Sequence, residues 1–89
     1  MKLNSVVFKK RVLNILLTKN SELQESDFHF AKETSGDYLV YRPLHLQESP
    51  ADFIVHQDLN GSISVHGNLQ AMVPTIEKFE DLDDLERRM

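Results

Sequence analysis

Residues 52–67 constrain the fold more than any other stretch of the chain, because apolar and polar residues alternate there on both sides of an Asn-Gly pair. A two-residue loop at that pair would set Val55 opposite His66 and mix apolar with polar side chains along the ladder. A three-residue loop over residues 59–61 sets Val55 opposite Val65, and its glycine takes the left-handed conformation that ends such loops. We therefore predict a β-hairpin with the three-residue loop. The same register gives two further pairs, Asp58 with Ser62 and Gln57 with Ile63.

The predicted register divides this hairpin into two faces, because successive side chains of a strand point to opposite sides of the sheet. The apolar face carries Phe53, Val55, Ile63 and Val65. The other face carries Ile54, His56, Asp58, Ser62, Ser64 and His66. We expect the first face to lie in the core and the second to meet water.

Residues 28–42 predict a second hairpin of the same kind, with a three-residue loop over residues 34–36 and Phe30 opposite Val40. The predicted core side chains are Phe28, Phe30, Tyr38 and Val40. The predicted outer side chains are His29, Ala31, Glu33, Asp37, Leu39 and Tyr41. Leu39 and Tyr41, together with Ile54, then form either a small patch for a partner or scattered apolar side chains on a solvated face.

Two helices are predicted outside the hairpins. The first runs over residues 6–19, is capped by Asn4 or Ser5, and presents a broad apolar arc. The second begins after a cap at Asn68 and keeps helical spacing from residue 69 to residue 85. Pro74 either bends this helix, restarts it, or acts as a hinge. Residues 43–51 form a connecting loop or a short edge strand.

These elements predict a single α+β domain over residues 1–89. The order is αββββα, with a four-stranded antiparallel meander and both helices on one of its faces. The spacing of the residues identifies no known family.

The charges are separated along the sequence, although the net charge is only −4. The first 20 residues carry no acid, and all 14 acidic residues follow them. A basic patch for nucleic acid, an acidic surface for a basic partner, and two solvated helix faces that pair with each other all explain this division.

The sequence offers little catalytic chemistry. It contains no cysteine, no Gly-rich phosphate loop and no nucleophile motif, so we expect a protein without enzymatic activity and without a cofactor. His56 and His66, with Asp58 farther along the same face, suggest a metal site, and two hydrated surface histidines explain the same pattern. His29 opposite Tyr41 is either an acid and base pair or an aromatic contact.

Our leading hypothesis is a small acidic protein-binding module that regulates or inhibits a partner by occupying a basic surface, as phage inhibitors and immunity proteins do. The candidate contact residues are Glu77, Glu80, Asp81, Asp83, Asp84, Leu39, Tyr41, Ile54, His56 and His66. A nucleic-acid-binding accessory protein is the first alternative, with Lys9, Lys10 and Arg11 as its candidates. A histidine-based metal-binding or catalytic domain is the second alternative.

Composition adds expectations about location and assembly. No apolar run approaches the roughly 20 residues that a membrane span needs, and residues 6–17 are interrupted by charges, so we expect a cytoplasmic protein that meets no membrane. The broad apolar arc of the first helix and the partly apolar outer face of the sheet also fit a homodimer.

Overall fold

The computed structural model describes residues 2–19, 21, 23–42, 53–67 and 76–88. Within these residues the chain forms two α-helices, one short 3-10 helix and five strands, so the α+β class is confirmed. Their bounds, in chain order, are α1 Ser5–Lys19, η1 Glu25–Asp27, β1 Phe28–Glu33, β2 Gly36–Tyr41, β3 Phe53–Asp58, β4 Ile63–Gly67, β5 Ile76–Phe79 and α2 Leu82–Arg88. The predicted connection over residues 43–51 and the roles predicted for Asn68 and Pro74 lie outside the described residues.

The first helix begins at Ser5, one residue before its predicted start, and Asn4, one of the two predicted caps, is its N-cap. The Val6 N–H donates a hydrogen bond to Asn4 Oδ1 at 2.9 Å, and the Phe8 N–H donates to the Asn4 carbonyl at 2.8 Å. The first bond satisfies an N–H group that has no backbone partner in the first turn, and the second is the first i→i−4 bond of the helix. The buried side chains of α1 are Phe8, Val12, Leu13, Ile15 and Leu16.

Replacing Asn4 with alanine is expected to lower the free energy of unfolding by about 1 kcal/mol, because the first turn loses its side-chain acceptor. Urea unfolding followed by circular dichroism measures this loss. Asn14→Ala is the matched control, since Asn14 lies exposed in the middle of the same helix. Equal destabilisation by the two substitutions would show that the cap contributes nothing.

The strands form one antiparallel sheet in the order β1-β2-β3-β4-β5. Val55 lies opposite Val65, so the register predicted for the hairpin of β3 and β4 is confirmed. Gly61 has a φ of 94° and ends the loop in the left-handed region. Asp58 stabilises the loop, because its Oδ1 accepts hydrogen bonds from the N–H groups of Asn60 and Ser62 at 2.8 and 3.1 Å.

The register predicted for the hairpin of β1 and β2 is wrong by one residue. Glu33 lies opposite Gly36, so the loop has two residues and not three. All the face assignments on β2 reverse as a result. Asp37 and Leu39 are each 0% exposed, and Tyr41 packs against the core. Tyr38 and Val40, which were predicted in the core, instead share the opposite face with His56 and Ile54. The pairing predicted for His29 with Tyr41 is also wrong, since His29 lies opposite Val40.

The prediction of a long second helix is also wrong in part, because residues 76–79 form a fifth strand. β5 pairs antiparallel with β4, which places Phe79 opposite Ile63, and the four-stranded meander is therefore incomplete. Helical structure begins only at α2. There the Asp84 N–H donates a hydrogen bond to Asp81 Oδ1 at 2.8 Å, so the Asp81 side chain caps the short helix.

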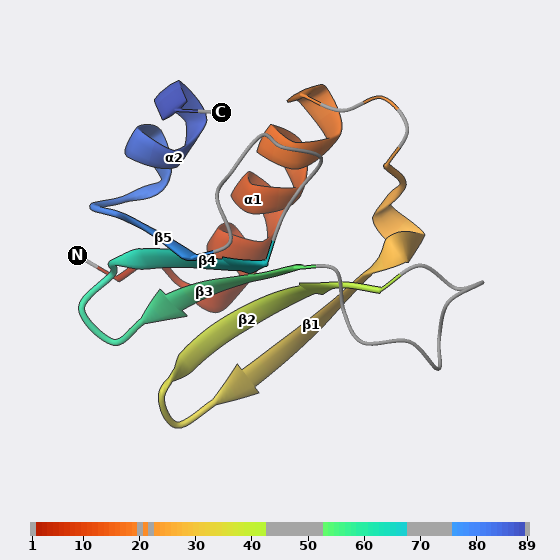
Figure 1. The fold of residues 1–89 in the computed structure, drawn as a ribbon. Coiled ribbons are helices and arrows are strands. Elements are labelled where there is room, and N and C mark those ends of the chain that lie inside the picture. Colours follow the sequence, from red (N-terminus) through yellow and green to blue (C-terminus); the bar gives the residue numbers. More distant parts are fainter. Residues whose placement is uncertain (1, 20, 22, 43–52, 68–75, 89) are drawn as a thin grey trace.

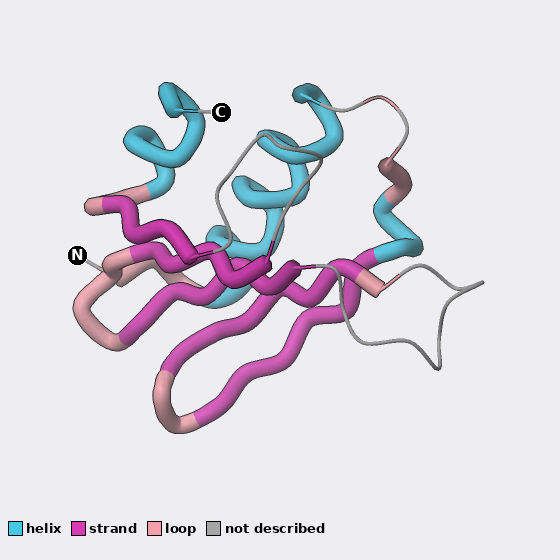
Figure 2. The backbone as a smooth tube through the Cα atoms, in the orientation of Figure 1, coloured by secondary structure: helices cyan, strands magenta, loops and turns pink. Residues whose placement is uncertain are grey.

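Both helices lie on the same side of the sheet, with α1 crossing it and α2 near the β5 edge (Figure 1). Figure 2 shows this division into one layer of helices and one layer of strands. Buried side chains from the helices and from the facing side of the sheet form one cluster. The opposite side of the sheet, which we call the outer face, carries no described helix.

Candidate functional site

A pocket of about 240 Å³ opens where the start of α1, the β3–β4 hairpin and the start of α2 meet. Its lining combines apolar, acidic, amide and basic groups: Leu3, Arg11, Gln57, Gly61, Ile63, Asp81, Leu82 and Asp83. This volume is below the range of roughly 300 to 1,000 Å³ that is typical of small-molecule sites. The pocket therefore suits one side chain or a small polar group better than a large ligand.

The amide of Gln57 joins the N-terminal segment to the sheet at the inner side of this pocket. Gln57 Oε1 accepts a hydrogen bond from the Leu3 N–H at 2.9 Å, and Gln57 Nε2 donates to the Leu3 carbonyl at 3.0 Å. The side-chain amide thus pairs with the Leu3 backbone as a neighbouring strand would.

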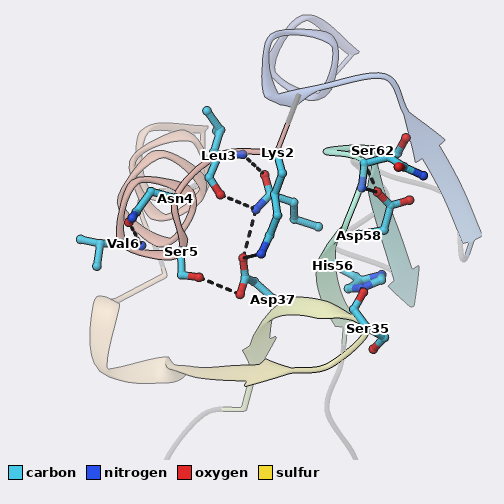
Figure 3. Close-up of polar contacts among 12 residues, drawn as sticks. Lys2, Leu3, Asn4, Ser5, Val6, Ser35, Asp37, His56, Asp58 and Ser62 are labelled. Atoms are coloured by element: carbon cyan, nitrogen blue, oxygen red, sulfur yellow. Dashed lines mark hydrogen bonds and ion pairs between the residues drawn. The ribbon is translucent and has the colours of Figure 1, made fainter.

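Asp37 completes this buried polar network (Figure 3). Asp37 and Gln57 are both 0% exposed, and Gln57 Nε2 also donates to Asp37 Oδ2 at 3.1 Å. Ser5 Oγ donates to Asp37 Oδ1 at 2.9 Å, and Lys2 Nζ lies 3.8 Å from Asp37 Oδ2. Buried polar groups of this kind are stable only when their partners are present, so the network holds residues 2–5 in place.

Sequence reasoning assigned no role to Asp37 or to Gln57 in this network. A signal for Gln57 was present, because it follows Phe53 and Val55 on the core-facing positions of β3. A polar residue on an apolar face needs a buried partner. Asp37 carried no such signal, since the predicted register placed it on the outer face.

The mouth of the pocket brings opposite charges together. Arg11 Nη2 lies 2.8 Å from Asp83 Oδ1, although the side chains remain 42% and 72% exposed. An exposed pair of this kind contributes about 0.2 to 1 kcal/mol to stability. The contact joins the basic and acidic halves of the sequence, as one of the three interpretations of the charge separation predicts.

The acidic candidates divide into two groups. Glu77 forms an ion pair with Arg88, Asp84 lies within 3.9 Å of the same guanidinium, and Asp81 caps α2. The other two, Glu80 and Asp83, belong to a stretch in which most acidic side chains face solvent. We call residues 80–86 the acidic segment; its exposed acids are Glu80, Asp81, Asp83 and Glu86.

The outer-face candidates of β3 and β4 lie where the sequence places them. Ile54 is half-buried opposite His66, which is exposed. The His56 ring stacks on Tyr38 with a centroid distance of 4.3 Å, and His56 Nε2 lies 3.2 Å from the Ser35 carbonyl. These contacts give His56 a local structural role.

Two further candidates do not belong to that face. The outward positions predicted for Leu39 and Tyr41 are wrong, because the two-residue loop turns both toward the helices. The Tyr41 ring packs on Phe53 at 4.9 Å and on Phe28 at 5.3 Å. Two of the three residues of the predicted apolar patch therefore belong to the core, and Ile54 stays on the outer face.

The basic candidates of α1 are only partly available. Arg11 pairs with Asp83, and Lys9 Nζ lies 6.0 Å from the centre of the Phe30 ring. Lys10 is exposed. These three side chains thus do not form a common row of unengaged positive charge.

The described residues bring no three His, Cys, Asp or Glu side chains together in a group that could hold a metal ion. Asp58 uses its carboxylate within its own loop, and His56 is stacked on Tyr38. His56 and His66 sit on diagonal positions of neighbouring strands, as predicted.

Comparisons with protein-family models, with curated proteins and with solved structures each find no match for this chain. None of the helices within the described residues has the length and apolar character needed to cross a membrane.

Proposed function

We propose that the protein is a small non-enzymatic binding module that regulates or inhibits a protein partner by holding a basic surface of that partner against the acidic segment. The observation that carries this proposal is the pocket beside that segment. Asp81 and Asp83 stand among its lining residues together with the apolar side chains of Leu3, Ile63 and Leu82.

This combination fits a lysine or arginine side chain of the partner. Such a side chain buries its apolar stem while its charged end stays near water and carboxylates. Arg11 already neutralises part of the charge of Asp83, but Glu80 and Glu86 are exposed on the same segment and remain negative. The neighbouring leucines, Leu82 and Leu85, are each 1% exposed and hold the segment against the core.

The substitution Asp83→Lys tests the proposal, because it reverses an exposed charge at the mouth of the pocket without removing a cap of α2. We expect it to weaken partner binding about tenfold or more, since attraction becomes like-charge repulsion. Affinity capture from cell lysate with mass spectrometry identifies the partner. Titration of the purified pair then measures the dissociation constant at low and high salt.

Glu25→Lys is the matched control, because Glu25 is also an exposed acid and lies in η1, outside the pocket. We expect the control to bind as the wild type does and the wild-type affinity to fall as salt screens the charges. Equal effects of Asp83→Lys and Glu25→Lys would contradict the proposed site. An affinity independent of salt would contradict the proposed electrostatic basis.

A further inference from the structure

One hydrogen bond shows which backbone groups of β1 point toward β2 and which point away from the sheet. β1 is the first strand in the sheet order, and the Arg42 N–H donates to the Asp27 carbonyl at 2.7 Å just beyond its end. Hydrogen-bonded and non-hydrogen-bonded pairs alternate along an antiparallel ladder. The backbone groups of His29, Ala31 and Glu33 therefore face β2, whereas those of Phe28, Phe30 and Lys32 point away from the sheet.

The opposite edge of the sheet is protected by the chain itself. The same alternation, counted from the Asp58 to Ser62 hydrogen bond, points the Lys78 carbonyl away from β4. Arg88 Nη2 donates to that carbonyl at 3.1 Å, and the Arg88 guanidinium lies 4.3 Å from the centre of the Phe79 ring. Thus α2 covers part of the β5 edge (Figure 1).

The β1 edge has no comparable cover among the described residues. β1 contains no proline, and its pairing with β2 is unbroken from Phe28 to Glu33. Proteins commonly protect an exposed edge with proline, a bulge, a charged side chain or a covering segment. Among the residues of β1 whose backbone groups point away from the sheet, only Lys32 has a charged side chain. β1 can therefore pair with another strand if that strand accommodates Lys32.

We propose that β1 pairs antiparallel with β1 of a second copy of this chain, with Ala31 at the two-fold axis. In this register Lys32 lies opposite Phe30 of the second copy, where an ammonium group can rest near an aromatic ring. Glu33 lies opposite His29, so an acid faces a group that can carry positive charge. Each of these pairs occurs twice because of the symmetry, and together they favour a second copy over an unrelated strand.

The neighbouring symmetric register, centred on Phe30, is disfavoured. It would set Glu33 opposite Asp27 of the second copy twice, and like charges directly opposite each other destabilise a ladder. The Ala31 register uses the outward N–H and C=O groups of Phe30 and Lys32 as its hydrogen-bonded pairs. It joins the two sheets into one continuous sheet and keeps the helices of both copies on the same side.

A cysteine crosslink tests this register, because the chain contains no natural cysteine. In Ala31→Cys the two new cysteines would lie across a non-hydrogen-bonded pair, with Cα atoms about 4.5 Å apart, within the range of a disulfide. We expect mild oxidation to convert this variant to a covalent dimer. His29→Cys is the matched control on the same outer face of β1, and it should stay uncrosslinked because its copies lie too far apart.

The substitution Lys32→Pro removes an outward N–H and leaves the ladder to β2 intact, since proline is tolerated at a sheet edge. By analytical ultracentrifugation over a concentration series, we expect the wild type to approach the mass of two copies and Lys32→Pro to remain a monomer. Circular dichroism and thermal unfolding check that the variant is folded. Hydrogen exchange at the Phe30 and Lys32 amides should be slowed about tenfold or more in the dimer.

A wild type that is monomeric throughout, with fast exchange at the Phe30 and Lys32 amides, overturns the proposal. A dimer that persists in Lys32→Pro, or that crosslinks equally through His29→Cys and Ala31→Cys, also overturns it, because another surface would then hold the copies together. Pairing of β1 with a strand of a different protein would appear as protection of the same amides only in a mixture, and that result also contradicts the second copy. Asp83→Lys should leave dimerisation unchanged, so this proposal and the proposed function are tested separately.

Discussion

Replacing Gly36 with alanine is expected to lower the free energy of unfolding by about 3 to 5 kcal/mol, although the substitution removes no side-chain contact. Gly36 has a φ of 137°, a backbone conformation that residues with a Cβ atom rarely adopt. An added Cβ would also overlap the Gln57 backbone carbonyl and lie 2.8 Å from His56 Nε2. The His56 ring can move, but the carbonyl belongs to the neighbouring strand and cannot move without disturbing the ladder.

Urea unfolding measures this loss, and the soluble yield reports variants that do not fold. Thr34→Ala in the same turn is the control, because Thr34 is exposed and its replacement should change stability by no more than about 0.5 kcal/mol. A Gly36→Ala variant within 1 kcal/mol of the wild type, a threshold set by typical single-substitution effects, would contradict the close approach of β2 and β3 described here.

The substitution Gln57→Leu is expected to cost about 2 to 4 kcal/mol, although it keeps most of the buried volume. Leucine cannot bond to the Leu3 backbone or to Asp37, so buried donors and acceptors lose their partners. Besides a lower free energy of unfolding, we expect faster hydrogen exchange at the Leu3 amide, because the N-terminal segment loses its attachment to the sheet.

The control for this substitution is Ser64→Ala, which changes a half-buried side chain on the outer face of the neighbouring strand. It should leave the exchange rate at Leu3 unchanged and lower stability by less than about 1 kcal/mol. If Gln57→Leu were as stable as the wild type, the amide network would be dispensable and apolar packing alone would hold residues 2–5.

A hairpin register was predicted correctly only where the alternation of apolar and polar side chains determined the length of the loop. In β3 and β4 both strands alternate clearly, so one register alone kept Val55 opposite Val65, and that register is observed. In β2, Tyr38, Leu39, Val40 and Tyr41 are all apolar or aromatic, and the alternation gave no preference between the two registers. The glycine was then assigned to the loop, whereas it closes the ladder opposite Glu33.

β5 was missed for a different reason. The apolar residues between 69 and 85 match helical spacing, and residues 76–79 (Ile, Glu, Lys, Phe) do not alternate apolar with polar, so the local pattern favoured a helix. The strand forms because β4 offers it an edge. Contacts between segments distant in sequence depend on the tertiary arrangement. The sequence marks Gln57 as a polar residue on an apolar face, but it does not identify Leu3 and Asp37 as the partners of this residue.

The hydrogen bonds of the N-terminal segment also favour one register between β2 and β3. Asp37 and Gln57 lie directly opposite each other in β2 and β3, and Ser5 and Leu3 bond to this pair. A slip of one residue between the two strands would turn Asp37 to the other face and leave the segment without its acceptor. The contacts of the segment therefore stabilise the observed register over the slipped one. Residues 3 and 5 find their buried partners only where β2 and β3 are paired in the observed register.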